Sequence, residues 1–339
     1  MTAILLIAIG SLGAASFYVP FKQVKHWSWE SYWIIQGLAA WILAPWIFAL
    51  TAIGAGPLSE ILSQAAPQTK WLVMLFGALW GVGGLTFGLS IRYMGVALGQ
   101  SITLGLCAAV GTLVPAFRSD GDLFSNRAGV LTLIGVAITL AGIATIGYAG
   151  ALKNKSLSEA QRREAVKDFA LKKGILIALL SGIMSACFAF GLEAGKPLEE
   201  LAAGLGTRPL YVSNPSLIFI LLGGFITNLS YCVFLNIRNK SYRDYFGVSA
   251  GVFFNNLAFT FLAGVLWFMQ FHFFGMGKSL LPESMAAFAW SILMALNIAM
   301  ANIWGLFLKE WKGVSRPTVL ILIIGIIVLI ASTFVVKLT

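Results

Sequence analysis

Charged residues are scarce in this sequence. Only 11% of its 339 residues are Asp, Glu, Lys or Arg, whereas soluble domains carry about 25%. Hydrophobic residues make up 59% of the chain, and the mean hydropathy is +0.88. This balance excludes an ordinary soluble domain and predicts an integral membrane protein.

The residues that build catalytic and metal centres are also few. The two histidines, His26 and His272, lie far apart in the sequence, and the three cysteines all fall inside apolar runs. An odd number of such cysteines does not form a disulfide framework. No HExxH motif occurs, and no acid lies in the middle of an apolar run. We therefore expect no enzymatic activity, no metal site and no cofactor.

Long apolar runs are abundant. A helix needs about 20 apolar residues to cross a bilayer, and the runs are continuous rather than alternating, which favours helices over a β-barrel. The first run has no basic residues before it, so we expect a retained helix rather than a signal peptide. We predict an all-α polytopic membrane protein with ten transmembrane helices at residues 3–21, 31–53, 71–92, 95–117, 128–150, 174–193, 213–236, 249–276, 285–308 and 317–336.

The net charge of +10 predicts orientation, not nucleic-acid binding, because the basic residues lie in short gaps between spans. Most of the 23 Lys and Arg residues follow the odd-numbered spans. The positive-inside rule then places these gaps in the cytoplasm and both termini outside. The only long polar gap, 151–173, is predicted to be a cytoplasmic linker between two five-span halves, 1–150 and 174–339.

The two halves contain similar segments. GALWGVGGLTFG at 77–88 matches GVLWFMQFHFFG at 264–275, and LGAASFYVPFKQVK at 12–25 matches IMSACFAFGLEAGK at 183–196. Five spans is an odd number, so two such copies are inverted across the membrane, as in carriers that work by alternating access. Chance similarity is the alternative, since membrane helices share a small set of residues.

Four motifs keep a recognisable order: FYVPFKQVKHWSWE, GALWG…FGLSIRYMG, LEAGKP…PLYVSNPS and LKEW. With these motifs the chain resembles, over nearly its whole length, the L-rhamnose–proton symporter family of the drug/metabolite transporter superfamily. The resemblance implies a multi-pass carrier of the bacterial inner membrane that imports L-rhamnose with a proton. The chain departs from the family pattern at Glu193, where an amide is usual, and at His272, where an aromatic residue is usual.

A carrier of a deoxysugar needs flat aromatic faces for the C–H surfaces and amide or hydroxyl groups for the ring hydroxyls. Gln270 lies one helical turn beyond Trp267, so the two are expected to share a face. Packing between helices is the alternative for each polar residue. The predicted substrate-binding residues are Trp267, Gln270, Trp80, Tyr18, Ser16, Asn256 and Asn302.

Proton coupling has three candidates. Glu30 and Glu193 lie at the ends of spans, and His272 is the one imidazole within an apolar run. Glu30 is expected to lie near Lys22 or Lys25, so that its pKa responds to the state of the carrier. The alternatives are a helix-start acid for Glu30 and a packing residue for His272.

The stretch between the first two spans is predicted to form an inner gate. Pro20 ends or bends the first helix, and Lys22 and Lys25 mark the cytoplasmic side. Trp27, Trp29 and Trp33 are also typical of an interfacial aromatic belt.

Other carriers stay open as alternatives, including one for a different sugar or metabolite, an exporter and a uniporter. A channel is disfavoured because no filter loop or charged ring is visible.

Overall fold

The computed structural model describes residues 1–120, 123–124, 126–156 and 170–338, and all regular structure in these ranges is helical. Within these described ranges, ten helices are long and apolar enough to cross a membrane, which confirms the predicted all-α polytopic fold. They comprise Thr2–Phe21, Trp29–Ile53, Pro67–Met94, Ala97–Arg118, Arg127–Lys155, Leu171–Gly204, Pro209–Arg238, Ala250–Lys278, Phe288–Phe307 and Arg316–Leu338.

Several of these spans are built from more than one helical segment. The first consists of α1 (Thr2–Ser16) and α2 (Tyr18–Phe21), and the second of α3 (Trp29–Gly37), the π-helix η1 (Leu38–Leu43) and α4 (Ala44–Ile53). The third to fifth are α6 (Pro67–Met94), α7 (Val96–Asp120) and α8 (Arg127–Lys155). The later spans contain α10 (Leu171–Ala194), α11 (Lys196–Gly204), η2 (Pro209–Tyr211), α12 (Asn214–Arg238), α13 (Ala250–Lys278), α14 (Phe288–Phe307), α15 (Arg316–Ser332) and η5 (Thr333–Leu338).

The breaks in the helices follow from particular residues. Pro20 has no N–H to donate to the carbonyl of Ser16, and the first helix is interrupted between α1 and α2, near that position. Pro45 likewise cannot donate to Trp41, and the π-helical turn immediately precedes it. Gly95, with φ of 81°, makes the tight turn between α6 and α7, where the predicted spans 71–92 and 95–117 leave only two residues.

Several shorter helical elements lie outside the predicted spans, wholly or nearly so. The amphipathic α5 (Ala55–Gln64) follows the second span, α11 and η2 lie between the sixth and seventh predicted spans, η3 (Ser241–Tyr245) lies between α12 and α13, and η4 (Glu283–Met285) precedes α14. The predicted linker lies mostly at 157–169, outside the described residues.

The chain forms two compact units. The first unit contains Met1–Ala8, Val82–Phe190 and Leu280–Thr339, and the second contains Ile9–Gly81 and Gly191–Ser279. Each unit therefore draws on both sequence halves. The division into the repeats 1–150 and 174–339, and their inverted relation, stay predictions.

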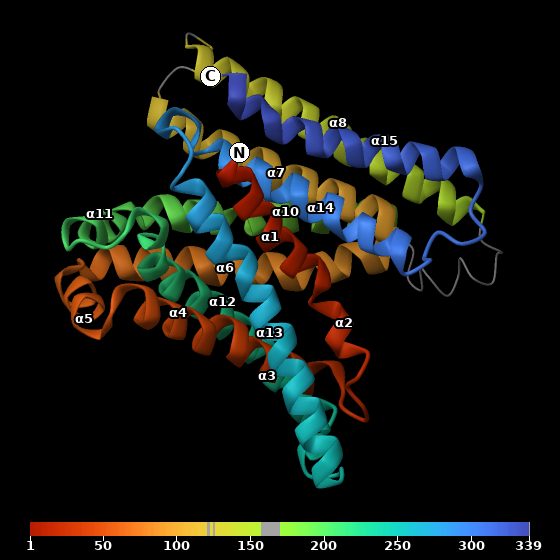
Figure 1. The fold of residues 1–339 in the computed structure, drawn as a ribbon. Coiled ribbons are helices and arrows are strands. Elements are labelled where there is room, and N and C mark those ends of the chain that lie inside the picture. The colour runs from red at the N-terminus through yellow and green to blue at the C-terminus, as the bar shows by residue number, and fades with distance from the viewer. Residues whose placement is uncertain (121–122, 125, 157–169, 339) are drawn as a thin grey trace. The chain divides into compact units, whose positions relative to one another are not determined.

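The first unit is a helical bundle in which α8 packs along both α7 and α15 (Figure 1). Its core contains Phe188, whose ring stacks on Trp290 with the centroids 5.5 Å apart. A Cβ on Gly135 would lie 2.3 Å from Phe288, so only glycine allows this ring to pack on α8.

The second unit is assembled around α3, η1, α12 and α13, which pack on one another. A Cβ on Gly77 would lie 2.0 Å from the carbonyl oxygen of Ile220, and this allows α6 to approach the backbone of α12. The three cysteines of the chain, Cys107, Cys187 and Cys232, are free and buried.

Candidate functional site

Five aromatic rings gather in the second unit and are called the tryptophan cluster below. Trp41 is central, with ring centroids 5.4 Å from Trp267, 6.2 Å from Trp33 and 6.3 Å from Trp80. Trp80 and Trp267 lie 5.6 Å apart, and Phe271 lies 4.9 Å from Trp267. Such rings supply the flat apolar faces on which the C–H surfaces of a sugar pack.

One stripe of α13 carries part of the cluster. Thr260, Gly264, Trp267 and Phe271 recur at helical spacing, so they lie on one face. A Cβ on Gly264 would lie 2.6 Å from both the carbonyl oxygen of Gln36 and the Cβ of Ala39. The glycine therefore brings the face of α13 directly against α3 and η1.

Glycines also leave space for the tryptophan rings. A Cβ on Gly224 of α12 would lie 2.4 Å from Cζ3 of Trp80, and one on Gly37 would lie 2.8 Å from the ring of Trp41. Trp41 belongs to the π-helical turn before Pro45, and such turns are frequent at functional sites. Small residues and a local change in helical pitch thus position both rings.

Polar atoms without partners lie on the elements that carry this cluster. Gln36 is 0% exposed, and neither its Oε1 nor its Nε2 makes a hydrogen bond within the described residues. The same holds for Nε1 of Trp41 and Oγ1 of Thr260. A buried unpaired polar group costs about 1–3 kcal/mol, so native proteins retain few without a functional reason.

The sequence did not identify Gln36 and Trp41 as site residues. The signal for Gln36 was present, since it is the only Gln, Asn or charged residue inside the predicted span 31–53, and intramembrane polar residues tend to be functional. Its lack of a partner becomes visible only once the helices are packed.

The predicted substrate-binding residues do not all lie together in the structure. Trp80 and Trp267 belong to the tryptophan cluster. Gln270, next to it on α13, donates its amide to the Trp267 carbonyl oxygen at 3.1 Å. Ser16 donates to the Leu12 carbonyl oxygen at 2.7 Å, and Tyr18 is 60% exposed.

Asn256 binds backbone instead. Its Nδ2 donates to the carbonyl oxygen of Lys25 at 2.7 Å, and its Oδ1 accepts from the Lys25 N–H at 2.9 Å. The neighbouring Asn255 donates to the carbonyl oxygen of Gln23 at 2.8 Å. The predicted gate segment is thus held on α13 by two asparagines, and His26 within it has a φ of 59°.

Glu30 lies at the start of α3 and is only 6% exposed. Its Oε1 accepts hydrogen bonds from Oγ of Ser241 at 2.6 Å and from Nδ2 of Asn239 at 2.9 Å. Within the described residues it forms no ion pair with Lys22 or Lys25, so that expectation was wrong. Neutral donors from the end of α12 and from η3 hold this carboxylate instead.

A second carboxylate, Asp244 of η3, belongs to the same network. Its Oδ2 accepts from Oγ of Ser31 at 2.8 Å and from the Ser28 N–H at 2.7 Å. Ser31 lies more than two hundred residues earlier in the chain, so no local sequence pattern indicates this contact.

Tyr245 completes this carboxylate network. Its hydroxyl donates to the Ser31 carbonyl oxygen at 2.9 Å. Burial raises the pKa of Tyr245 to about 12, and the charges of Asp244 and Glu30 act in the same direction. The hydroxyl therefore remains protonated and able to donate at physiological pH.

The other two proton-coupling candidates have different surroundings. Glu193 pairs with Lys196 one turn away, and both side chains are partly exposed. His272 is buried, with Nδ1 3.3 Å from Oδ1 of Asn214 and its ring stacked 6.1 Å from that of Tyr211. Of the three, Glu30 is the buried acid.

The aromatic residues of the gate stretch also separate. Trp27 is buried and packs edge-on against Tyr245 at 5.2 Å, and Trp33 belongs to the tryptophan cluster. Trp29 is 38% exposed. The packing of Trp27 and Trp33 inside the second unit differs from the exposed position expected of an interfacial belt.

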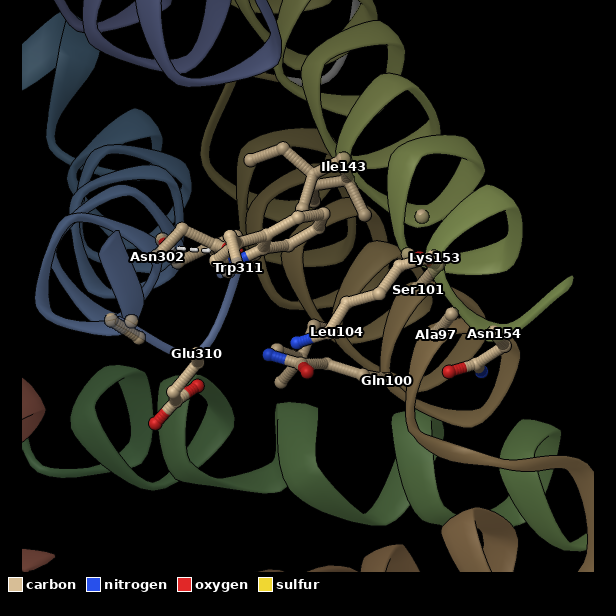
Figure 2. Close-up of a pocket in the computed structure, with 16 residues that line it drawn as sticks. Ala97, Gln100, Ser101, Leu104, Ile143, Lys153, Asn154, Asn302, Glu310 and Trp311 are labelled. Atoms are coloured by element: carbon tan, nitrogen blue, oxygen red, sulfur yellow. Dashed lines mark hydrogen bonds between the residues drawn. The ribbon is translucent and has the colours of Figure 1, made fainter. Parts of the chain in front are cut away.

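Asn302 lies in the first unit, where it lines a cavity of about 370 Å³ (Figure 2). Its Nδ2 donates to the Ile298 carbonyl oxygen at 2.8 Å. Nζ of Lys153 lies 4.6 Å from the centre of the Trp311 ring in the same cavity.

The ten long apolar helices of the described residues define a polytopic α-helical membrane protein with buried polar side chains. More specifically, the chain belongs to the L-rhamnose-proton symport protein family (RhaT), whose profile matches residues 1–339. A protein of Yersinia pestis (strain Pestoides F) named L-rhamnose-proton symporter is 37% identical over 334 residues, covering 97% of this chain and 95% of its own. A protein of the same name from Yersinia pseudotuberculosis serotype O:1b (strain IP 31758) has the same identity and coverage.

Proposed function

We propose that this protein imports L-rhamnose, or a closely related deoxysugar, together with a proton by alternating access. Family membership and the names of the relatives support the substrate and the coupling ion. The protein is then a secondary transporter of the bacterial inner membrane with both termini outside, and not an enzyme.

The observation that carries this proposal is the unpaired amide of Gln36 beside the tryptophan cluster. An amide both donates and accepts hydrogen bonds, as vicinal sugar hydroxyls require. Trp41 and Thr260 offer a further indole N–H and a hydroxyl. Trp80 and Trp267 present apolar faces, which suit the C–H surfaces and methyl group of a deoxysugar.

Trp41 and Phe271 of this cluster are buried, whereas Trp33, Trp80 and Trp267 are partly exposed. The polar atoms of Gln36, Trp41 and Thr260 lack partners. Hydroxyl groups of a sugar bound at the partly exposed rings would pair these atoms. Binding would thereby relieve the cost of leaving them unpaired.

Glu30 is the proposed proton carrier. It is buried, it has only neutral hydrogen-bond donors, and these donors come from Asn239 and Ser241 on other elements. Movement of α3 away from these residues would remove the donors and favour protonation of the carboxylate. Pro20, Lys22 and Lys25, the last held by Asn256, form the proposed inner gate, whose closure would alter the environment of Glu30.

Uptake of radiolabelled L-rhamnose into proteoliposomes tests the function. We expect saturable accumulation driven by an inward proton gradient and abolished by a protonophore. Accumulation that is indifferent to the gradient would indicate a uniporter or another coupling ion. No uptake in either condition would overturn the substrate and call for a panel of other sugars and metabolites.

A further inference from the structure

The cavity of the first unit lies where three spans end. Residues at the start of α7, the end of α8 and the end of α14 line it, and the turn after α14 contributes Glu310 and Trp311. Its volume of about 370 Å³ falls in the range of about 300–1,000 Å³ that is typical of small-molecule pockets.

Its polar side chains have unused hydrogen-bonding capacity. Gln100, Ser101 and Asn154 line the cavity, and their side chains make no hydrogen bond with any described part of the chain. Figure 2 shows Gln100, Lys153 and Trp311 converging on the same space, with Glu310 at its edge. Three neutral polar groups therefore face a space large enough for a ligand.

The charges of the cavity favour a neutral ligand. Lys153 is its one basic lining residue and Glu310 its one acidic residue, so their formal charges cancel. Neither forms an ion pair within the described ranges, and Lys153 lies over the Trp311 ring instead. A net anion or cation would gain from one of these charges and be repelled by the other.

Apolar side chains complete the lining. Leu104, Ile143, Ile146 and Ile298 line the cavity together with small residues. Amide, hydroxyl and indole groups together with branched aliphatic side chains suit a molecule that carries both hydroxyl groups and a methyl group. A deoxyhexose has this character.

We propose that this cavity is a second binding site for the transported deoxysugar, in addition to the tryptophan cluster. The proposal rests on the proposed function. In the predicted orientation the C-terminal end of α8 faces the cytoplasm, so the site would hold an imported sugar before release. Gln100 and Asn154 bind hydroxyl groups there, and the isoleucines contact the methyl group.

Equilibrium binding of radiolabelled L-rhamnose to the purified full-length protein tests the stoichiometry. We expect two sugars per chain in the wild type, one in Gln36→Ala and one in the double variant Gln100→Ala/Asn154→Ala. Gln68→Ala, which changes an exposed glutamine of the second unit, serves as the matched control and keeps both. If the wild type binds one sugar per chain, and Gln36→Ala abolishes this binding while the double variant retains it, the second site is overturned and the proposed function is not. No binding by wild type would overturn the proposed function as well.

Protection from alkylation locates the sugar. Ala301 lines the cavity and is exposed, and the native cysteines are buried. Ala301→Cys in the Gln36→Ala background should react with N-ethylmaleimide about tenfold more slowly at a sugar concentration of about ten times Kd. Ser63→Cys, an exposed position in the second unit, should show no protection. If Ala301→Cys is alkylated at the same rate with and without L-rhamnose, the proposal is overturned. This result would count even if the double variant fails to fold.

Discussion

Trp80 and Trp267 occupy equivalent places in the two repeated motifs, and their ring centroids lie 5.6 Å apart. The glycines three residues before them make matching contacts. Gly77 of the third span packs on Ile220 of the seventh, and Gly264 of the eighth packs on Ala39 of the second. Spans at equivalent positions of the two halves thus exchange partners, as a two-fold repeat would require. The inverted relation of the halves stays a prediction that this pattern favours.

Replacing Gln36 should separate stability from transport. Gln36→Leu removes a buried amide without partners, so we expect the free energy of unfolding to rise by about 1–3 kcal/mol while L-rhamnose uptake is lost. Thermal unfolding in detergent and proteoliposome uptake measure the two effects. Gln270→Leu is the control, because it removes a hydrogen-bonded amide and should lower stability. A stable Gln36→Leu protein with normal uptake would remove Gln36 from the site.

Replacing Glu30 should uncouple sugar from proton movement. The carbonyl oxygen of Gln can still accept from Asn239 and Ser241, so Glu30→Gln should fold. We expect it to lose accumulation driven by a proton gradient but to retain exchange of labelled for unlabelled L-rhamnose at equal concentrations, since exchange needs no net proton transfer. Glu193→Gln, at a partly exposed ion pair, should behave like wild type. Gradient-driven accumulation by Glu30→Gln would disprove the role of Glu30.

Releasing the gate segment should make its backbone accessible. Asn256→Ala removes both hydrogen bonds to Lys25, at a cost of about 1–3 kcal/mol for the pair. Hydrogen exchange at the amides of residues 22–28 should accelerate in this variant. Asn255→Ala removes a single bond to Gln23 and should give a smaller acceleration at the same amides. Unchanged exchange in both variants would mean that other contacts hold the segment.

Displacing Trp80 should impair transport without a change in any polar group. The added methyl of Gly224→Ala would lie 2.4 Å from the Trp80 ring, which must then move. We expect a raised KM for L-rhamnose uptake. Gly251→Ala in α13 meets nothing within 4 Å and provides the control. A normal KM for Gly224→Ala would show that the position of Trp80 is unimportant.

Tyr245 should affect stability but not the pH profile of transport. Its pKa is raised from the ordinary 10.0 to about 12, so the stabilisation by its hydroxyl is complete below pH 10 and is lost only as pH rises toward 12. Tyr245→Phe should therefore change the uptake rate by the same factor at every pH from about 5 to 9. A shift in the pH profile would indicate that Tyr245 takes part in proton movement.

Hydropathy was sufficient for the fold, because spanning a bilayer requires about 20 apolar residues whatever their partners. The short gap between the predicted spans 71–92 and 95–117 agrees with the tight turn at Gly95, and Pro20 itself predicted a break in the first helix. The site was harder to predict. Trp80 and Trp267 were identified because a repeat marked them, whereas Gln36 and Asp244 depend on which helices meet. Asp244 lies beside Ser31 through packing alone, and no local pattern encodes that contact.

The assembly of each unit from both halves has a consequence for synthesis. Glu30 receives its hydrogen bonds from Asn239 and Ser241, and the former lies 209 positions later in the chain. At about 5–20 residues per second, a ribosome needs about 10–40 s to supply these donors. The second span therefore reaches the membrane long before its acid has partners, and a chain terminated before Asn239 leaves that carboxylate exposed to quality control.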